Sequence, residues 1–243
     1  MLKDYIQVSQ QKMTEQISNF YTPSGIQVYF KDQMLGAPVD VEKVVAKFES
    51  VVPQHLIDEV EMIIIGHFDE FEERDINAFY RDGALHISNV QSDEPDLLDD
   101  MIHETAHACE SAYGQEIYGD SKIKDEFLRK RLHLYNILWK MGFKAPKSIF
   151  LEIEYDREFD DFLFKDVGYD TMGKAITGLF INAYAATSLR EYFATGFTDF
   201  YLQPNDHSFL KKTSPALYDK LALLHNINKF DWHLRLLCYN NIV

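Results

Sequence analysis

The sequence has few cysteines, few basic residues and no long apolar runs. Cys109 and Cys238 are the only cysteines in 243 residues, which is too few for a disulfide framework. No stretch reaches the roughly 18–20 apolar residues of a membrane span, and residues 1–7 contain no apolar run like that of a signal peptide. We therefore expect a protein without disulfides or membrane spans that stays in the cytoplasm, although export by a non-classical route would leave the same sequence.

Basic residues are outnumbered by acidic ones. The chain has 24 Lys and Arg against 39 Asp and Glu, for a formal net charge of −15. Nucleic-acid binding is not expected, because it requires a basic face that displaces counterions from phosphates. The acidic residues concentrate in residues 58–104, with fifteen carboxylates against two arginines. This segment is either a solvated face or a negative rim that favours basic peptides.

Internal repeats and Gly- or Pro-rich linkers are also absent. With 46% hydrophobic residues the chain can bury a substantial core, so we expect a single domain over residues 1–243. Its first part predicts strand, helix, strand and hairpin, and its later part predicts mostly helices. The expected fold class is therefore α+β, with a small mixed N-terminal sheet packed on a helix, an upper lobe of about residues 1–114, and a helical lower lobe of about residues 115–243.

Local signals place several of these elements. Asp40 is a candidate N-cap for an amphipathic helix over residues 39–48. The β-branched residues 60–65 suit a central strand, and Asp82-Gly83 is a strong hairpin signal. We expect the second hairpin strand, residues 84–88, to expose His86 and to offer a free edge that pairs with an extended peptide.

Residues 101–110 contain His-Glu-x-x-His within an apolar helical pattern. His103 and His107 are four positions apart, so both imidazoles lie on one helix face and can bind one Zn²⁺ ion. Glu104 then lies beside the metal without binding it, where it can take a proton from an attacking water and return it to a leaving amine. The stripe Leu97, Leu98, Met101, Ile102, Ala106 and Cys109 predicts that the opposite face is buried.

A catalytic zinc site needs a third protein ligand. One class of zinc proteases continues as His-x-x-Gly-x-x-His, but this chain has Glu110 and Tyr113 at those two positions. Glu126 lies 19 residues after His107, within a charged helix that is also consistent with a solvated surface. The other candidate, Glu191, also fits a capping box, Ser-x-x-Glu, which is a purely structural role. The spacing alone leaves both glutamates open.

Two stretches carry a family resemblance. Glu191-Tyr-Phe-Ala-x-x-Phe and His107-Ala-Cys-Glu-Ser-Ala-Tyr-Gly resemble the catalytic domain of anthrax lethal factor and its relatives, gluzincins that include bacterial Pro-Pro endopeptidases. The resemblance covers roughly residues 84–225 and implies a zincin-like fold. It also implies that Glu191 is the third zinc ligand and that Tyr184, seven residues earlier, points its hydroxyl at the substrate oxyanion. Thr195 departs from the pattern, because many relatives have a second acid there.

Together these features predict a zinc-dependent endopeptidase acting on a peptide or protein substrate. His103, His107 and Glu191 would bind Zn²⁺, and Glu104 and Tyr184 would assist catalysis. Glu110 is expected either to orient His107 or to be exposed. The alternative is a zincin-fold binding or toxin-like module with little turnover.

Overall fold

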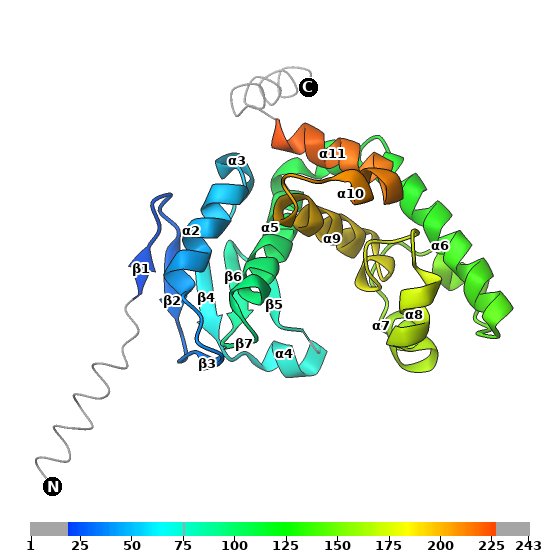
Figure 1. The fold of residues 1–243 in the computed structure, drawn as a ribbon, viewed down its shortest axis with the longest axis horizontal. Coiled ribbons are helices and arrows are strands. Elements are labelled where there is room, and N and C mark those ends of the chain that lie inside the picture. The colour runs from blue at the N-terminus through cyan, green and yellow to red at the C-terminus, as the bar shows by residue number, and fades with distance from the viewer. Residues whose placement is uncertain (1–18, 75, 227–243) are drawn as a thin grey trace, which may run out of the picture. The chain divides into compact units, whose positions relative to one another are not determined.

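The computed structural model describes residues 19–74 and 76–226. The chain divides into two compact units, Met1–Ala108 and Cys109–Val243. Helix α5 (Glu94–Tyr118) runs through the boundary, so the first part of α5 belongs to unit 1 and its last turns belong to unit 2 (Figure 1).

Unit 1 is built on a five-stranded mixed sheet. Its strands are β1 (Phe20–Tyr21), β2 (Gln27–Phe30), β4 (Met62–Gly66), β5 (Ala78–Arg81) and β6 (Ala84–Ser88), in the order β1-β2-β4-β6-β5. The three inner strands are parallel, and each edge strand is antiparallel to its neighbour. A second, two-stranded parallel sheet joins β3 (Leu35–Gly36) to β7 (Val90–Gln91). The sheet and the helices described below confirm an α+β fold.

The side chains of the central strands explain why these residues form strands in the middle of the sheet. Ile63 and Ile65 in β4 are fully buried, as expected for a β-branched run in the middle of a sheet. The β5–β6 hairpin turns at Asp82 and Gly83, whose φ angles of 50° and 81° lie in the left-handed region that a tight two-residue hairpin requires. The sequence prediction of this hairpin is confirmed.

Two expectations for the second hairpin strand are wrong. Strand β6 pairs with β4 on one side and β5 on the other, so it has no free edge. Within the described part of the sheet, β1 and β5 are the edge strands. His86 is not exposed either: only 8% of its surface is accessible, and its ring stacks on Phe79 with centroids 4.4 Å apart. A strand between two neighbours, with both faces covered, buries even its polar residues.

Three helices connect the strands of unit 1: α2 (Val41–Val51), α3 (Gln54–Ile57) and α4 (Asp69–Arg74). The side chain of Asp40 accepts a hydrogen bond from the amide of Lys43 (3.1 Å), which confirms Asp40 as the N-cap of α2. Val44 and Phe48 are buried on the apolar face of α2. Figure 1 shows α2 and the first part of α5 running alongside the strands.

Helix α5 is capped at its start by Asp93. Asp93 Oδ1 accepts a hydrogen bond from the amide of Asp96 (2.9 Å) and so caps the first turn. Five of the six members of the predicted apolar stripe have no accessible surface: Leu97, Met101, Ile102, Ala106 and Cys109; the sixth, Leu98, is half-buried. The other cysteine, Cys238, lies outside the described residues. Burial of this stripe fixes which face of α5 is left for the two histidines.

Every regular element in the described part of unit 2 is a helix. After α5 these are α6 (Lys122–Met141), η1 (Lys147–Phe150), α7 (Arg157–Asp161), η2 (Phe162–Val167), α8 (Tyr169–Ala175), η3 (Tyr184–Ala186), α9 (Leu189–Leu202), α10 (Ser208–Thr213) and α11 (Pro215–His225). Gly142 ends α6, with a φ of 103° that favours glycine. Among the described residues, no helix has the length and apolar character needed to cross a membrane.

Candidate metal centre

The two histidines lie one turn apart on α5. The ring centroids of His103 and His107 are 5.3 Å apart, and both side chains are half-buried. Because the opposite face of the helix is packed into the core, the imidazoles project from the face that remains. Local helix geometry alone therefore brings these two nitrogen ligands together.

Glu191 lies in the first turn of α9. The hydroxyl of Ser188, the N-cap, accepts a hydrogen bond from the Glu191 amide (3.1 Å). This is the backbone half of the capping box that the sequence indicates. The cap fixes the main chain of Glu191, and the carboxylate extends away from it.

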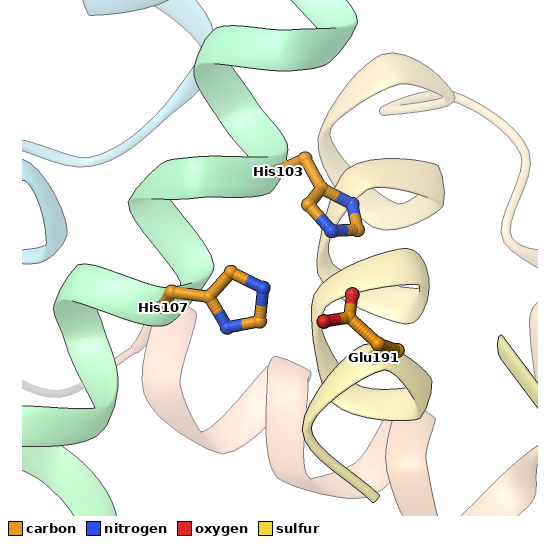
Figure 2. A group of neighbouring side chains, drawn as sticks. All are labelled: His103, His107 and Glu191. Atoms are coloured by element: carbon orange, nitrogen blue, oxygen red, sulfur yellow. The ribbon is translucent and has the colours of Figure 1, made fainter. Parts of the chain in front are cut away.

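The structure brings His103, His107 and Glu191 into one group. Each residue offers one ligand atom, and these atoms all lie within 4.8 Å of one another. In Figure 2 the two imidazoles from α5 and the carboxylate from α9 point into a common space. These residues could hold a metal ion.

The donor set fits zinc. Two imidazole nitrogens and one carboxylate oxygen are a ligand combination of catalytic zinc sites, which keep a fourth position open. Two ligand atoms at roughly 2.0–2.2 Å from one zinc ion lie at most about 4.4 Å apart. Small side-chain rotations would therefore bring this group from within 4.8 Å to bonding geometry.

Glu126, the other candidate ligand, is engaged elsewhere. Its side chain in α6 is 4% exposed and accepts hydrogen bonds from the Tyr192 hydroxyl (2.8 Å) and from the amides of Ala216 (2.8 Å) and Leu217 (3.2 Å). These two amides belong to the first turn of α11. Glu126 therefore ties α6, α9 and α11 together and is not a member of the group of three.

Glu104 is a buried carboxylate next to the first histidine. It lies on α5 directly after His103, with 7% of its surface accessible. Its position relative to the two histidines is fixed by the helix itself. Little more than one turn of α5 thus presents two imidazole rings and one carboxylate.

Tyr184 lies outside the group of three, in the η3 turn that precedes α9. Its side chain is 40% exposed. It lines a cavity of about 60 Å³ together with Asp160, Phe164 and Thr187. The turn is held by the hydroxyl of Thr187, which donates to the carbonyl of Tyr184 (2.8 Å).

An ion pair that the sequence did not reveal lies beside the group. Arg190 donates from Nε to Glu110 Oε2 (2.7 Å), with Nη2 also 2.5 Å from that oxygen. The Tyr118 hydroxyl donates to the other oxygen of Glu110. The hydrogen bond from Arg190 to Glu110 raises the pKa of Arg190. The pKa of Tyr118 is raised by burial and, in addition, by the charge of Glu110. No local signal links residues 80 positions apart.

Acidic side chains on α5 precede the histidines. Burial raises the pKa of Asp100 to about 7, although the side-chain amide of Gln91 donates to its Oδ2 (3.2 Å) and acts in the opposite direction. Burial also raises the pKa of Asp99, with His103 opposing it. Asp100 therefore carries less negative charge near neutral pH than its sequence indicates.

The comparisons with known proteins give no match. No protein-family model matches the chain, and neither the curated proteins nor the solved structures include a significant match.

Proposed function

We propose that this protein is a zinc-dependent endopeptidase with a zincin-like fold, a gluzincin resembling the catalytic domain of anthrax lethal factor. The observation that carries the proposal is the convergence of His103, His107 and Glu191, from helices 84 residues apart in sequence, into one potential metal site. Such convergence is not expected of a chance His-Glu-x-x-His on a solvated helix.

In the proposed hydrolysis, different residues of the chain have different roles. When bound, zinc supplies Lewis acidity, polarising a carbonyl and lowering the pKa of a water molecule to about 7. Glu104, held beside His103 by the helix, takes the proton of the attacking water and delivers it to the leaving amine. General acid–base assistance of this kind contributes typically about 10²–10⁴-fold to the rate.

Tyr184 is the proposed hydrogen-bond donor to the oxyanion. Its partial exposure leaves the side chain accessible to a substrate, and the η3 turn fixes its backbone through Thr187 and through the Asn182 side chain, which accepts from the amide of Ala185 (2.9 Å). A donor fixed before the reaction stabilises developing charge without reorganising.

The proposed substrate is a peptide in an extended conformation. Within the described part of the sheet, strand β5 pairs only with β6, so its outer edge would pair with such a peptide. Basic peptides are favoured by the acidic residues of unit 1, which include Asp69, Glu70 and Glu72 in the first turn of α4.

The test combines metal analysis, a peptide-library digest and the substitution Glu104→Gln. We expect the parent protein to bind one zinc ion and to cleave peptides in a chelator-sensitive manner. Glu104→Gln should keep its zinc and lose turnover, whereas the control Glu116→Gln, the same change further along α5, should cleave at the parent's rate.

Other outcomes separate the alternatives. A parent that binds zinc but cleaves no peptide supports a binding or toxin-like module. Zinc-loaded Glu104→Gln that cleaves at the parent's rate removes the proposed role of Glu104. A parent that binds no zinc refutes the metal site itself.

A further inference from the structure

We infer that the Glu110–Arg190 pair, completed by Tyr118, positions the third ligand of the metal site. The inference rests on the proposed zinc function, but it concerns residues outside the ligand set. Glu110 lies one turn after His107 on α5, and Arg190 immediately precedes Glu191 on α9. The pair therefore links the helix that carries both histidines to the helix turn that carries Glu191.

Both oxygens of the Glu110 carboxylate are used. Oε2 accepts from two nitrogens of Arg190, at 2.7 and 2.5 Å, and Oε1 accepts from Tyr118. The Glu110 side chain is only 11% exposed, whereas that of Arg190 is 56% exposed. A largely buried carboxylate with both oxygens occupied has little freedom to move, so it is a fixed point for the arginine to bind.

The backbone of α5 explains how Tyr118 reaches Glu110. The helix departs from helical geometry at Tyr113 (φ −117°, ψ 15°), between Glu110 and Tyr118. Eight residues of regular helix would separate the two by about 12 Å along the axis. The hydroxyl of Tyr118 bonds across this kink and so holds the Glu110 carboxylate in place.

The metal site needs this link because its ligands have different origins. His103 and His107 are aligned by one helix turn, but Glu191 comes from 84 residues further along the chain. Metal sites require ligands held within about 0.5 Å of their bonding positions. Ser188 fixes the amide of Glu191, and Glu110 fixes the neighbouring side chain, so the first turn of α9 is anchored at two points.

The arrangement also accounts for the residue types. The guanidinium directs two N–H groups at one carboxylate oxygen, which a lysine ammonium does not reproduce in the same fixed geometry. The ion pair is neutral overall, so it orients the turn without adding net charge beside a cation. A surface ion pair with no positioning role would contribute little to metal binding.

Zinc affinity provides the test, measured by competition with a chromophoric chelator for the parent, Glu110→Gln, Arg190→Gln and the double variant. Partners that orient metal ligands typically contribute about 10–100-fold to affinity. We expect each single variant to bind zinc about 10–100-fold more weakly, and the double variant to be no weaker than the singles, because all three break the same link. Arg190→Lys should bind zinc more tightly than Arg190→Gln but more weakly than the parent.

A matched control uses another ion pair that joins α5 to a second helix. Lys43 of α2 pairs at 2.5 Å with Glu94 in the first turn of α5, more than two turns before His103. Lys43→Gln and Glu94→Gln should leave zinc affinity unchanged. The absorption spectrum of the cobalt(II)-substituted protein gives a second readout, and it should change in the Glu110 and Arg190 variants but not in the controls.

The outcomes discriminate between the proposals. If Glu110→Gln and Arg190→Gln bind zinc as tightly as the parent, with unchanged cobalt spectra, the positioning role is refuted. If the variants weaken zinc binding while the parent cleaves no peptide, the positioning role stands and the endopeptidase proposal fails. A parent without zinc affinity overturns both.

Discussion

Asp100 gives the most quantitative prediction. Its carboxyl group has a pKa of about 7 in the folded protein because it is buried, against 3.8 when it is unperturbed. The substitution Asp100→Asn keeps the shape and leaves an oxygen to accept the 3.2 Å hydrogen bond from Gln91. It removes only the ionisation.

The sign and size of the effect follow from proton linkage. Between pH 4 and 7 the unfolded chain has released this proton and the folded chain retains it, so stability falls as the pH rises through this window. Each pKa unit corresponds to about 1.36 kcal/mol, so the difference between 3.8 and about 7 gives a maximum of about 4 kcal/mol above pH 7.

The assay is urea unfolding of the metal-free protein, in the presence of a chelator, at pH values from 5 to 8.5. Asp100→Asn should exceed the parent in free energy of unfolding by up to about 4 kcal/mol at pH 8.5, and by much less at pH 5. Glu42→Gln, an exposed carboxyl on α2, is the control and should show no such trend. An Asp100→Asn advantage that is equal at both pH values, or a disadvantage at pH 8.5, would refute the reasoning.

Three further substitutions test the fold and the site. Glu126→Gln should lower the free energy of unfolding by about 2–4 kcal/mol without changing zinc affinity, because an amide cannot accept from three donors as the carboxylate does; chemical denaturation and zinc titration measure the two effects. Gly196→Ala should cost about 1–3 kcal/mol, since the new Cβ would lie 2.3 Å from Leu217 Cδ2, and thermal unfolding would show it. Tyr184→Phe should lower kcat about 10²–10³-fold with unchanged zinc affinity, and an unchanged kcat would exclude it as the oxyanion donor.

The features that the sequence predicted well are local. Asp40 and Ser188 are recognisable as N-caps because a cap depends on residues within three positions, and both hydrogen bonds are present. The Asp82-Gly83 hairpin and the pairing of His103 with His107 depend equally on short spacings.

The features that could not be predicted from the sequence depend on contacts between residues that are distant in the chain. Glu126 and Glu191 look alike as candidate ligands, and only the folded position of the Ala216 and Leu217 amides shows that Glu126 is already engaged. The prediction of an exposed edge for β6 was wrong for the same reason. The pairing of β6 with β5 is local in sequence, but the pairing of β6 with β4 is not. The Glu110–Arg190 pair has no signature in a single sequence.

The most direct test of the central claim is a crystal structure of the zinc-loaded protein with anomalous diffraction at the zinc edge. The account predicts one strong anomalous peak, bonded at roughly 2.0–2.2 Å to nitrogens of His103 and His107 and to a carboxylate oxygen of Glu191. A zinc ion bound without Glu191, or an anomalous peak elsewhere with these three residues apart, would contradict it.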